Sequence, residues 1–296
     1  MSGYDSDRLL AGLSEAREWV DGGLSELPFL SEAVSRLPAH SAYSLDAGGK
    51  RIRPFLVMQA CLAGGRSLDR ALPAACAVEM IHTYSLIHDD LPALDDDDLR
   101  RGVPTLHTVV GVPQAVLAGD LLLAEAFREL GRTPLGPGAV SKMLGLLAGA
   151  AGPAFLVGGQ YMDVNHPDEP GMDWIDSMIE GKTSAMIRVS LELGAVAGGF
   201  DDGTLAGVSS AGGRLGYLFQ LTDDILDLTG TEAEMGKGVS KDGGQDKANP
   251  VSVLGLEAAV GIAGDLALET AGLFEALPGD WEMVSMLARY LPGRRS

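Results

Sequence analysis

The segment Leu86–Gly102, LIHDDLPALDDDDLRRG, runs from an apolar stretch into a dense acidic cluster and then into two arginines. Six of the ten residues from Asp89 to Asp98 are aspartates. Carboxylates this close repel one another, and burying one without a partner costs free energy. The apolar run Ile81–Ile87 predicts a buried helix that carries Asp89 and Asp90 at its end. The sequence therefore indicates carboxylates placed to hold a cation.

The spacing within this cluster is not helical throughout. Asp95 follows Asp89 by six residues, with Pro92 between them. The proline predicts a bulge or kink that brings Asp95 back towards Asp89. For the remaining acids, Asp96 to Asp98, a solvated surface is the favoured interpretation.

Outside this segment, apolar residues recur mainly at helical spacing, and no convincing series of alternating strands appears. Glycine, proline and polar clusters divide the chain into roughly ten helices. No linker separates two halves, so we expect residues 1–296 to form one all-α domain. The apolar helix faces that we expect include Leu9, Leu10, Leu13 and Ala16; Leu117, Leu121, Ala124 and Leu130; and Val253, Leu254, Leu256 and Ala259.

The composition restricts the function. The chain has 22 basic and 41 acidic residues, a formal charge of −19, which disfavours a general nucleic-acid binder because phosphate backbones require a basic face. The two cysteines, Cys61 and Cys76, lie in apolar surroundings and are expected to be buried thiols. The first residues carry acids and lack an apolar core, so we expect no signal peptide and a cytoplasmic protein.

One uncharged run, Met143 to Met162, is long enough to raise the question of a membrane span. It contains five glycines, Pro153 and Gln160. We therefore expect buried helix and connection here, and no stable membrane insertion.

A second acidic cluster lies far downstream in FQLTDDILD, Phe219–Asp227. Asp223 and Asp227 are four residues apart and share one helix face, with Asp224 beside them. Their neighbours are largely apolar. Hard oxygen ligands without histidine or cysteine favour Mg²⁺, which keeps waters and usually bridges to substrate phosphates. The two clusters predict one shared site.

Basic residues recur beside these acids. Arginine pairs with phosphate oxygens as a fork, and lysine acts as a point charge. Taken one at a time, each is an ordinary surface residue, but together they favour a diphosphate pocket. They are Lys50, Arg51 and Arg53 in GGKRIRP, Arg100 and Arg101, Lys182, and Lys237, Lys241 and Lys247 after the second cluster.

With these motifs in order, the chain resembles the trans-prenyltransferases, the short-chain isoprenyl diphosphate synthases. The resemblance covers about Tyr43 to Arg294, and its motifs are GGKRIRP, DDLPALD followed by RRG, GGQYMD, the Lys182-Thr183 pair and FQLTDDILD. It implies an all-α bundle around a deep central cavity, usually a homodimer. The implied reaction is head-to-tail condensation of an allylic diphosphate with isopentenyl diphosphate.

The resemblance also implies roles for individual residues. Three Mg²⁺ ions would be present with substrate bound, held by Asp89, Asp90, Asp95, Asp223 and Asp227, with Asp224 next to these ligands. The allylic diphosphate would be bound by Arg100, Lys182, Lys237 and Lys247. Isopentenyl diphosphate would be bound by Lys50, Arg53, His82 and Arg101. Thr183 and Gln220 match positions that line the carbocation. For His82 the alternative is a core histidine with its hydrogen bonds satisfied, and His88 and His107 are expected to be structural.

The resemblance also implies that product length depends on bulk just before the first acidic motif. Tyr84 lies five residues before Asp89, Ser85 beside it is small, and the motif carries a two-residue insertion found in many bacterial enzymes of the family. Tyr84 together with the insertion favours a C15 product, farnesyl diphosphate. The alternatives are a geranylgeranyl diphosphate synthase and, for Tyr84, a core residue with no effect on length.

Three other classes of protein are disfavoured by the sequence. A non-catalytic subunit of a heteromeric prenyltransferase would be expected to lose aspartates from one motif, and this chain keeps both. A terpene cyclase would not be expected to combine two aspartate motifs with GGKRIRP. A purely structural helical protein would not need Lys50, Arg53, Arg100 and Lys182 beside two carboxylate clusters. The segment DKANPV, Asp246 to Val251, departs from the family pattern around Lys247.

Overall fold

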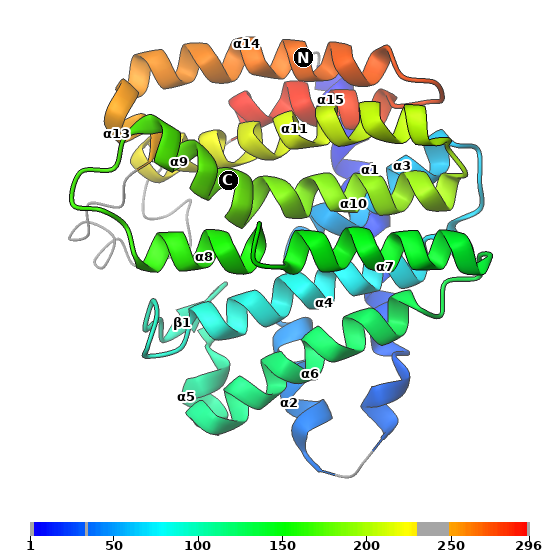
Figure 1. The fold of residues 1–296 in the computed structure, drawn as a ribbon, viewed down its shortest axis with the longest axis vertical. Helices are drawn as coiled ribbons and strands as arrows, with labels where there is room; N and C mark the ends of the chain where they lie inside the picture. The colour runs from blue at the N-terminus through cyan, green and yellow to red at the C-terminus, as the bar shows by residue number, and fades with distance from the viewer. Residues whose placement is uncertain (1–2, 33–34, 230–248, 295–296) are drawn as a thin grey trace.

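The computed structural model describes residues 3–32, 35–229 and 249–294, and these residues are almost entirely helical (Figure 1). The predicted all-α fold is confirmed. The first half contains α1 (Gly3–Ser25), α2 (Leu37–Asp46), α3 (Ile52–Ala63), α4 (Leu72–Asp89), β1 (Leu99–Arg100), β2 (Val103–Pro104), α5 (Leu106–Val110) and α6 (Val112–Leu130). The second half contains α7 (Pro137–Ala151), α8 (Leu156–Val164), α9 (Met172–Ile179), a π-helix (Glu180–Ser184), α10 (Ala185–Gly198), α11 (Asp202–Thr229), α13 (Pro250–Leu254), α14 (Leu256–Glu275) and α15 (Glu282–Tyr290).

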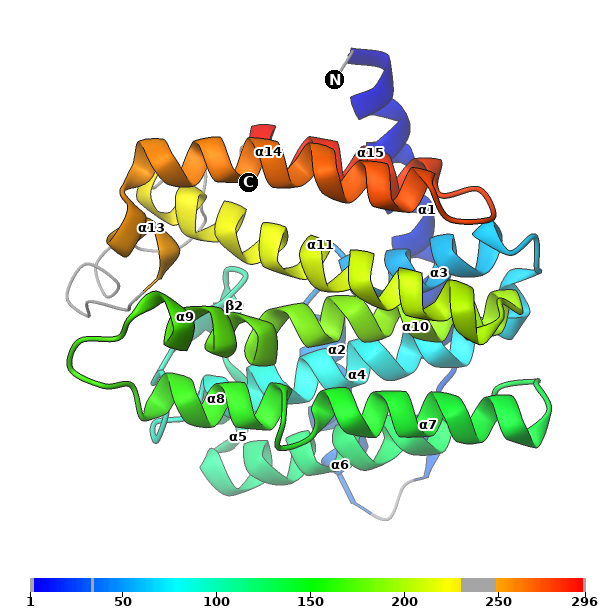
Figure 2. The same ribbon diagram turned by 45° about the horizontal axis from the view of Figure 1, so that its top comes forward.

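The helices stack in layers, as Figure 2 shows. From one side to the other, α14 lies on α11, α11 on α10, α10 on α3 and α4, and α4 on α6. Two apolar clusters fill the spaces between them. One is centred on α4, α6 and α7 and the other on α3, α11, α14 and α15, and α10 contributes side chains to both. The layers bring segments more than 100 residues apart into contact.

This stacking determines where the acidic motifs lie. The helices α4 and α11 both end on the left of Figure 1, so Asp89 and Asp223 approach the same end of the bundle. The only sheet in the described residues is the two-residue antiparallel ladder of β1 and β2. Sequence reasoning missed this ladder, since two residues are too short to show an alternating pattern.

Two of the predicted buried helix faces are wrong. On α6, Leu117 is 53% exposed, and the buried residues are mostly small, including Ala115 and Ala118. Near α13 and α14, Val253 and Leu256 are exposed, and only Ala259 of the predicted set is buried. Both helices are apolar on more than one side, so periodicity alone could not identify the packed side.

The uncharged run Met143–Met162 is also less buried than predicted. Within the described residues, Pro137–Val164 is the one stretch long and apolar enough to cross a membrane, and 28% of its most apolar window is buried. The stretch is not one helix, since α7 ends at Ala151 and α8 begins at Leu156. The predicted connection is therefore present, but much of the segment is exposed in a single copy of the chain.

Candidate active site

The first acidic motif lies where α4 ends. The backbone N–H of Asp95 donates to the carbonyl oxygen of Asp89 at 2.9 Å, so the chain folds back on the helix end. The predicted approach of Asp95 to Asp89 is thus present, although α4 ends at Asp89 rather than continuing through a kink. Burial raises the pKa of Asp89 to about 6, against the opposing effect of Lys182. A cation beside Asp89 would relieve this cost.

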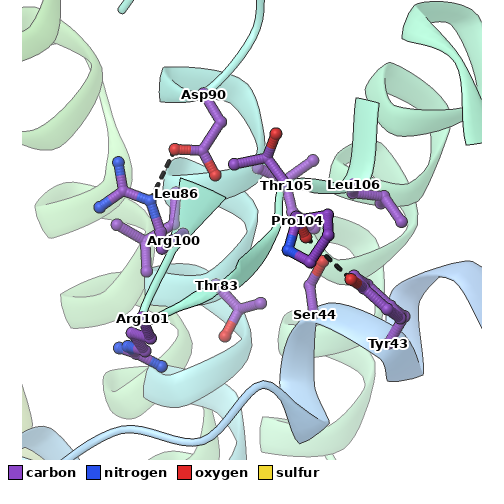
Figure 3. Close-up of a pocket in the computed structure, with 11 residues that line it drawn as sticks. Tyr43, Ser44, Thr83, Leu86, Asp90, Arg100, Arg101, Pro104, Thr105 and Leu106 are labelled. Carbon is purple, nitrogen blue, oxygen red and sulfur yellow. Dashed lines mark hydrogen bonds and ion pairs between the residues drawn. The ribbon is translucent and has the colours of Figure 1, made fainter. Parts of the chain in front are cut away.

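Asp90 is paired with the arginine that follows the motif, as Figure 3 shows. Arg100 lies on β1, and its Nε donates to Oδ1 of Asp90 at 2.6 Å. Asp90 is only 4% exposed, and Arg100 also reaches Asp97 at 3.4 Å. The two residues were predicted to bind different groups, a metal ion and a diphosphate. In this structure they neutralise each other, so both roles require the pair to open.

A small pocket adjoins this pair (Figure 3). Thr83 and Leu86 of α4 form one wall, and Arg101 and Thr105 lie on the hairpin side. The hydroxyl of Tyr43 donates to the carbonyl oxygen of Pro104 at 2.8 Å, which ties α2 to the hairpin. The β1–β2 ladder therefore holds both arginines beside the end of α4.

The second acidic motif occupies the last turns of α11. Asp223 is ion-paired with Arg294, near the end of the described chain. Arg294 is 8% exposed, donates to Oγ1 of Thr222 at 3.1 Å and packs over the ring of Phe219 at 4.6 Å. Sequence reasoning missed Arg294, because it lies 71 residues from Asp223 and no motif surrounds it.

Asp224 has a different role from its neighbour. Its Oδ1 accepts from Nε2 of Gln220 at 2.9 Å, and Oε1 of Gln220 accepts from the hydroxyl of Thr183 at 2.7 Å. The other carboxylate oxygen of Asp224 is buried without a hydrogen-bond partner. Burial raises the pKa of Asp224 to about 7, although the bond from Gln220 opposes the shift. Asp224 thus orients the two side chains that were predicted to line a carbocation.

Thr183 and Lys182 lie on a π-helix, Glu180–Ser184, between α9 and α10. Such single turns occur frequently at functional sites. The turn packs against the GGQYMD motif on α8, where a Cβ on Gly159 would lie 2.4 Å from the backbone nitrogen of Lys182. Lys182 is also ion-paired with Asp163, the last residue of that motif. The motif therefore allows close backbone approach and supplies the partner of Lys182, which the sequence alone did not indicate.

Three of the predicted cations, Arg53, Arg100 and Arg101, lie near His82. Burial, and then the charges of Arg53, Arg101 and Arg100, lower the pKa of His82 well below its usual value, so the imidazole is neutral at pH 7. Burial lowers the pKa of Lys50 and Arg53, and the charge of Asp223 opposes both shifts. Nε of Arg53 is buried without a hydrogen-bond partner. The positive charges of these side chains repel one another, so an anion bound among them would stabilise all of them.

Arg51, between Lys50 and the start of α3, is structural. It is 5% exposed and donates to Oε1 of Glu79 at 2.6 Å and to Oδ1 of Asp21 at 2.9 Å. Glu79 is 2% exposed on α4. This buried pair anchors the segment that carries Lys50 and Arg53.

The acidic side chains of both motifs are the candidate ligands of a metal ion. Among the described residues, no three histidine, cysteine or acidic side chains converge as a preformed metal cage. Mg²⁺ usually takes only one or two carboxylates and completes its octahedron with water and phosphate oxygens, so a cage is not required. Asp89 with its raised pKa and the unpartnered oxygen of Asp224 fit such a cation. The donor set is therefore suited to Mg²⁺ shared with a diphosphate.

The predicted product-length residues lie on α4. Tyr84 is 6% exposed within the apolar cluster, and burial and then Asp89 raise its pKa to about 12. The hydroxyl of Ser85 donates to the carbonyl oxygen of His82 at 2.9 Å. Lys237, Lys241 and Lys247 lie outside the described residues. Cys61 and Cys76 are buried and free, as predicted.

The site was then compared with known proteins. The polyprenyl synthetase family model matches residues 34–262. The chain is 41% identical over 251 residues to a farnesyl diphosphate synthase of Geobacillus stearothermophilus, covering 83% of this chain and 84% of that protein. It is 45% identical over 231 residues to a heterodimeric geranylgeranyl pyrophosphate synthase large subunit of Arabidopsis thaliana, covering 75% of this chain and 62% of the other.

Solved structures agree with these relatives. An FPP/GFPP synthase from Zymomonas mobilis has a TM-score of 0.85 and 31% identity, covering 97% of this chain and 99% of that one. A Helicobacter pylori geranyltransferase complexed with magnesium and isoprenyl diphosphate has a TM-score of 0.81 and 30% identity, covering 95% and 96% of the two chains. On the family match and these relatives, the chain belongs to the polyprenyl synthetase family.

Proposed function

We propose that this protein is a Mg²⁺-dependent prenyltransferase that condenses isopentenyl diphosphate head-to-tail with dimethylallyl and geranyl diphosphate to make farnesyl diphosphate. The observation that carries the proposal is that carboxylates and cations whose charged forms are disfavoured by burial meet at one end of the bundle. Asp89 and Asp224 have raised pKa values, while Lys50 and Arg53 have lowered ones. In a metal–diphosphate complex, the positive metal ion would stabilise the carboxylates and the negative diphosphate would stabilise the cations.

The acidic motifs are assigned to the metal and the cations to the diphosphates. Mg²⁺, three ions in the proposal, would be held by Asp89, Asp90, Asp95, Asp223 and Asp227, and it neutralises diphosphate charge when bound. Lys182 and Arg100 would contact the allylic diphosphate once they leave Asp163 and Asp90. Lys50, Arg53, Arg101 and His82 would bind isopentenyl diphosphate, with neutral His82 donating a hydrogen bond without adding charge.

The reaction then follows from charge and position. Breaking the allylic C–O bond leaves an electron-deficient carbon and a free diphosphate, which the cationic side chains stabilise by preorganised electrostatics. The double bond of isopentenyl diphosphate, held close, attacks this carbon. Oxygen atoms of Thr183 and Gln220, oriented through Asp224, would face the developing positive charge. The proton is lost to the departed diphosphate, so no separate side-chain base is needed.

A C15 product is proposed from the position of Tyr84. Its buried ring lies on α4 about one and a half turns before Asp89, so a chain growing from a diphosphate at Asp89 would meet it along the helix. A geranylgeranyl diphosphate synthase is the second candidate, because relatives of both kinds match at similar identity.

A homodimer is also proposed. Exposed apolar side chains on α6 and α8 include Leu117, Val157 and Tyr161, which are 53%, 52% and 70% exposed. An apolar surface of this kind is typical of an interface, and a second copy of the chain is the occupant that family membership favours. Light scattering should give twice the mass of the chain. A monomer under assay conditions would overturn this part of the proposal.

A product assay tests the central reaction. The purified protein is incubated with Mg²⁺, labelled isopentenyl diphosphate and, in turn, dimethylallyl, geranyl and farnesyl diphosphate. The products are dephosphorylated and sized. Farnesol from the first two primers, with farnesyl diphosphate unused, is the expected result. Geranylgeraniol would overturn the C15 assignment while keeping the reaction, and no elongation with any primer would contradict the prenyltransferase proposal itself.

A further inference from the structure

The ring of Tyr84 rests against a second ring on the same helix. His88 follows one turn later, the two ring centroids are 5.7 Å apart, and their planes meet at 81°. This edge-to-face arrangement is a preferred geometry for aromatic pairs. A residue that stops a growing chain has to keep its ring in place when the chain presses on it. The position of the Tyr84 ring therefore depends on what holds His88.

His88 is tied to the neighbouring helix. Its Nε2 lies 3.1 Å from the carbonyl oxygen of Val116 on α6 and 3.9 Å from Oδ1 of Asp120. Because a carbonyl oxygen only accepts, the first contact is a hydrogen bond when Nε2 carries the proton. His88 thus joins α4, which carries Tyr84, to α6. The imidazole lies between the Tyr84 ring and the backbone of α6.

The sequence of α6 leaves space for this ring at one position. A Cβ added to Gly119 would lie 2.2 Å from Nε2 and 2.6 Å from Cδ2 of His88. No real side chain tolerates such contacts, so a larger residue at position 119 would displace the imidazole. Three features on two helices, the Tyr84 ring, the hydrogen bond to Val116 and the glycine, therefore converge on the same histidine.

We propose that His88 is a positioning residue for product length, which holds the Tyr84 ring against the growing isoprenoid through its hydrogen bond to Val116 in the space left by Gly119. This inference rests on the proposed function of Tyr84 as the limit to chain growth. It assigns to His88 no contact with substrate or metal. Its effect passes through Tyr84, so a loss of His88 should change which product is made more than how fast the first condensation occurs.

The test is a double-mutant cycle read by product length. Tyr84→Ala, His88→Ala and the double variant are assayed with dimethylallyl diphosphate, isopentenyl diphosphate and Mg²⁺. We expect each single variant to raise the fraction of products longer than that of the unaltered protein several-fold. The double variant should match Tyr84→Ala, because His88 has nothing left to position.

A second variant tests the same contact from α6. Gly119→Ala should push the imidazole away and lengthen the product like His88→Ala, without altering any side chain of the first acidic motif. Gly261→Ala on α14 is the matched control, since an added Cβ there meets nothing within 4 Å. It should leave the product profile as it was. If His88→Ala does not fold, the same cycle is run with Gly119→Ala and Tyr84→Ala.

The outcomes separate the two proposals. Longer products from Tyr84→Ala with an unchanged profile from His88→Ala and Gly119→Ala would overturn the inference and leave the proposed function of Tyr84 intact. Further lengthening in the double variant would also overturn it, since His88 would then act independently. An unchanged product profile from Tyr84→Ala would overturn both the proposed role of Tyr84 and the inference about His88. A merely structural histidine would lower stability or rate without changing product length.

Discussion

The two acidic motifs meet at one end of the bundle, but one is paired with an arginine close to it in the sequence and the other with a distant arginine. Asp90 is paired with Arg100, ten residues further along the chain. Asp223 is paired with Arg294, 71 residues further along. The two carboxylates also differ in exposure, since the side chain of Asp90 is 6% exposed and that of Asp223 is 41% exposed. The first motif thus carries a buried local pair, and the second an open pair made by the fold.

This difference bears on how each motif accepts a metal ion. Water reaches the carboxylate of Asp223, so this acid can exchange Arg294 for another cation without being left dehydrated, although Arg294 itself is only 8% exposed. Asp90 is almost inaccessible, so opening its pair with Arg100 requires an immediate replacement. We infer that Asp89, whose pKa is raised and which forms an ion pair with no arginine of the described residues, is the first acid of its motif to meet the ion, while the Asp90–Arg100 pair supports the helix end.

The largest expected effect compares the motifs by removing one acid from each. Asp89→Ala and Asp223→Ala should each lower turnover by about 10³-fold or more, because charge stabilisation of the departing diphosphate is lost. Thermal unfolding should show that both variants still fold, since each change removes one carboxylate and leaves both apolar clusters intact. Near-normal turnover in either variant would remove that motif from the metal site.

The next comparison concerns the two arginines. Arg100→Gln leaves Asp90 buried and unpaired and should lower the free energy of unfolding by about 3 kcal/mol. Arg294→Gln leaves the carboxylate of Asp223 in contact with water but removes a guanidinium that is itself buried, and it should cost about 2 kcal/mol. Urea unfolding of both variants measures the difference.

Arg132→Gln is the control for this comparison. Arg132 forms an exposed pair with Glu129 at 3.1 Å, and losing it should have almost no effect. Equal losses from Arg100→Gln and Arg294→Gln would contradict the distinction between a buried pair and an open one.

The last comparison is the dependence of stability on pH. Asp89 and Asp224 have pKa values of about 6 and about 7 in the folded protein, against 3.8 for a free side chain. The folded state therefore holds more protons than the unfolded state, and stability without Mg²⁺ should fall as the pH rises from about 4 to about 7.

Asn variants isolate this effect. Asp89→Asn and Asp224→Asn should raise the melting temperature at pH 7 and change it little near pH 4, where the native acids are already protonated. In Asp224→Asn the amide oxygen still accepts from Gln220. The exposed Asp168→Asn serves as the control. A lower melting temperature at pH 7 in both site variants would show that the carboxylates stabilise the apo fold.

The sequence predicted the parts of the site that depend on local spacing. The return of Asp95 to Asp89 followed from Pro92, and the shared face of Asp223 and Asp227 followed from helical period. Partners from distant segments could not be predicted. Arg294 reaches Asp223 only through the packing of the turn Leu291–Gly293 on α11, and Asp163 reaches Lys182 only because Gly159 lets α8 approach the π-helix.

The fold class was predicted and the packed faces were not. Helical period without alternating strands was enough for an all-α fold. Leu117 was expected in the core because leucine usually is, but small alanines such as Ala115 and Ala118 allow α4 and α6 to pack closely and leave Leu117 outside. Which face of an apolar helix is buried depends on its neighbours, and the apolar period within that one helix does not identify them.

The measurement that tests the central claim most directly is calorimetric binding of inorganic diphosphate in the presence of Mg²⁺. It is made on the unaltered protein and on Asp89→Ala, Asp223→Ala and the double variant. If the two motifs form one metal–diphosphate site, the unaltered protein binds with Mg²⁺ and not without it, each single variant loses most of the affinity, and the double variant loses little more. Additive losses in the double variant, or full affinity in either single variant, would show that the two acidic motifs act separately.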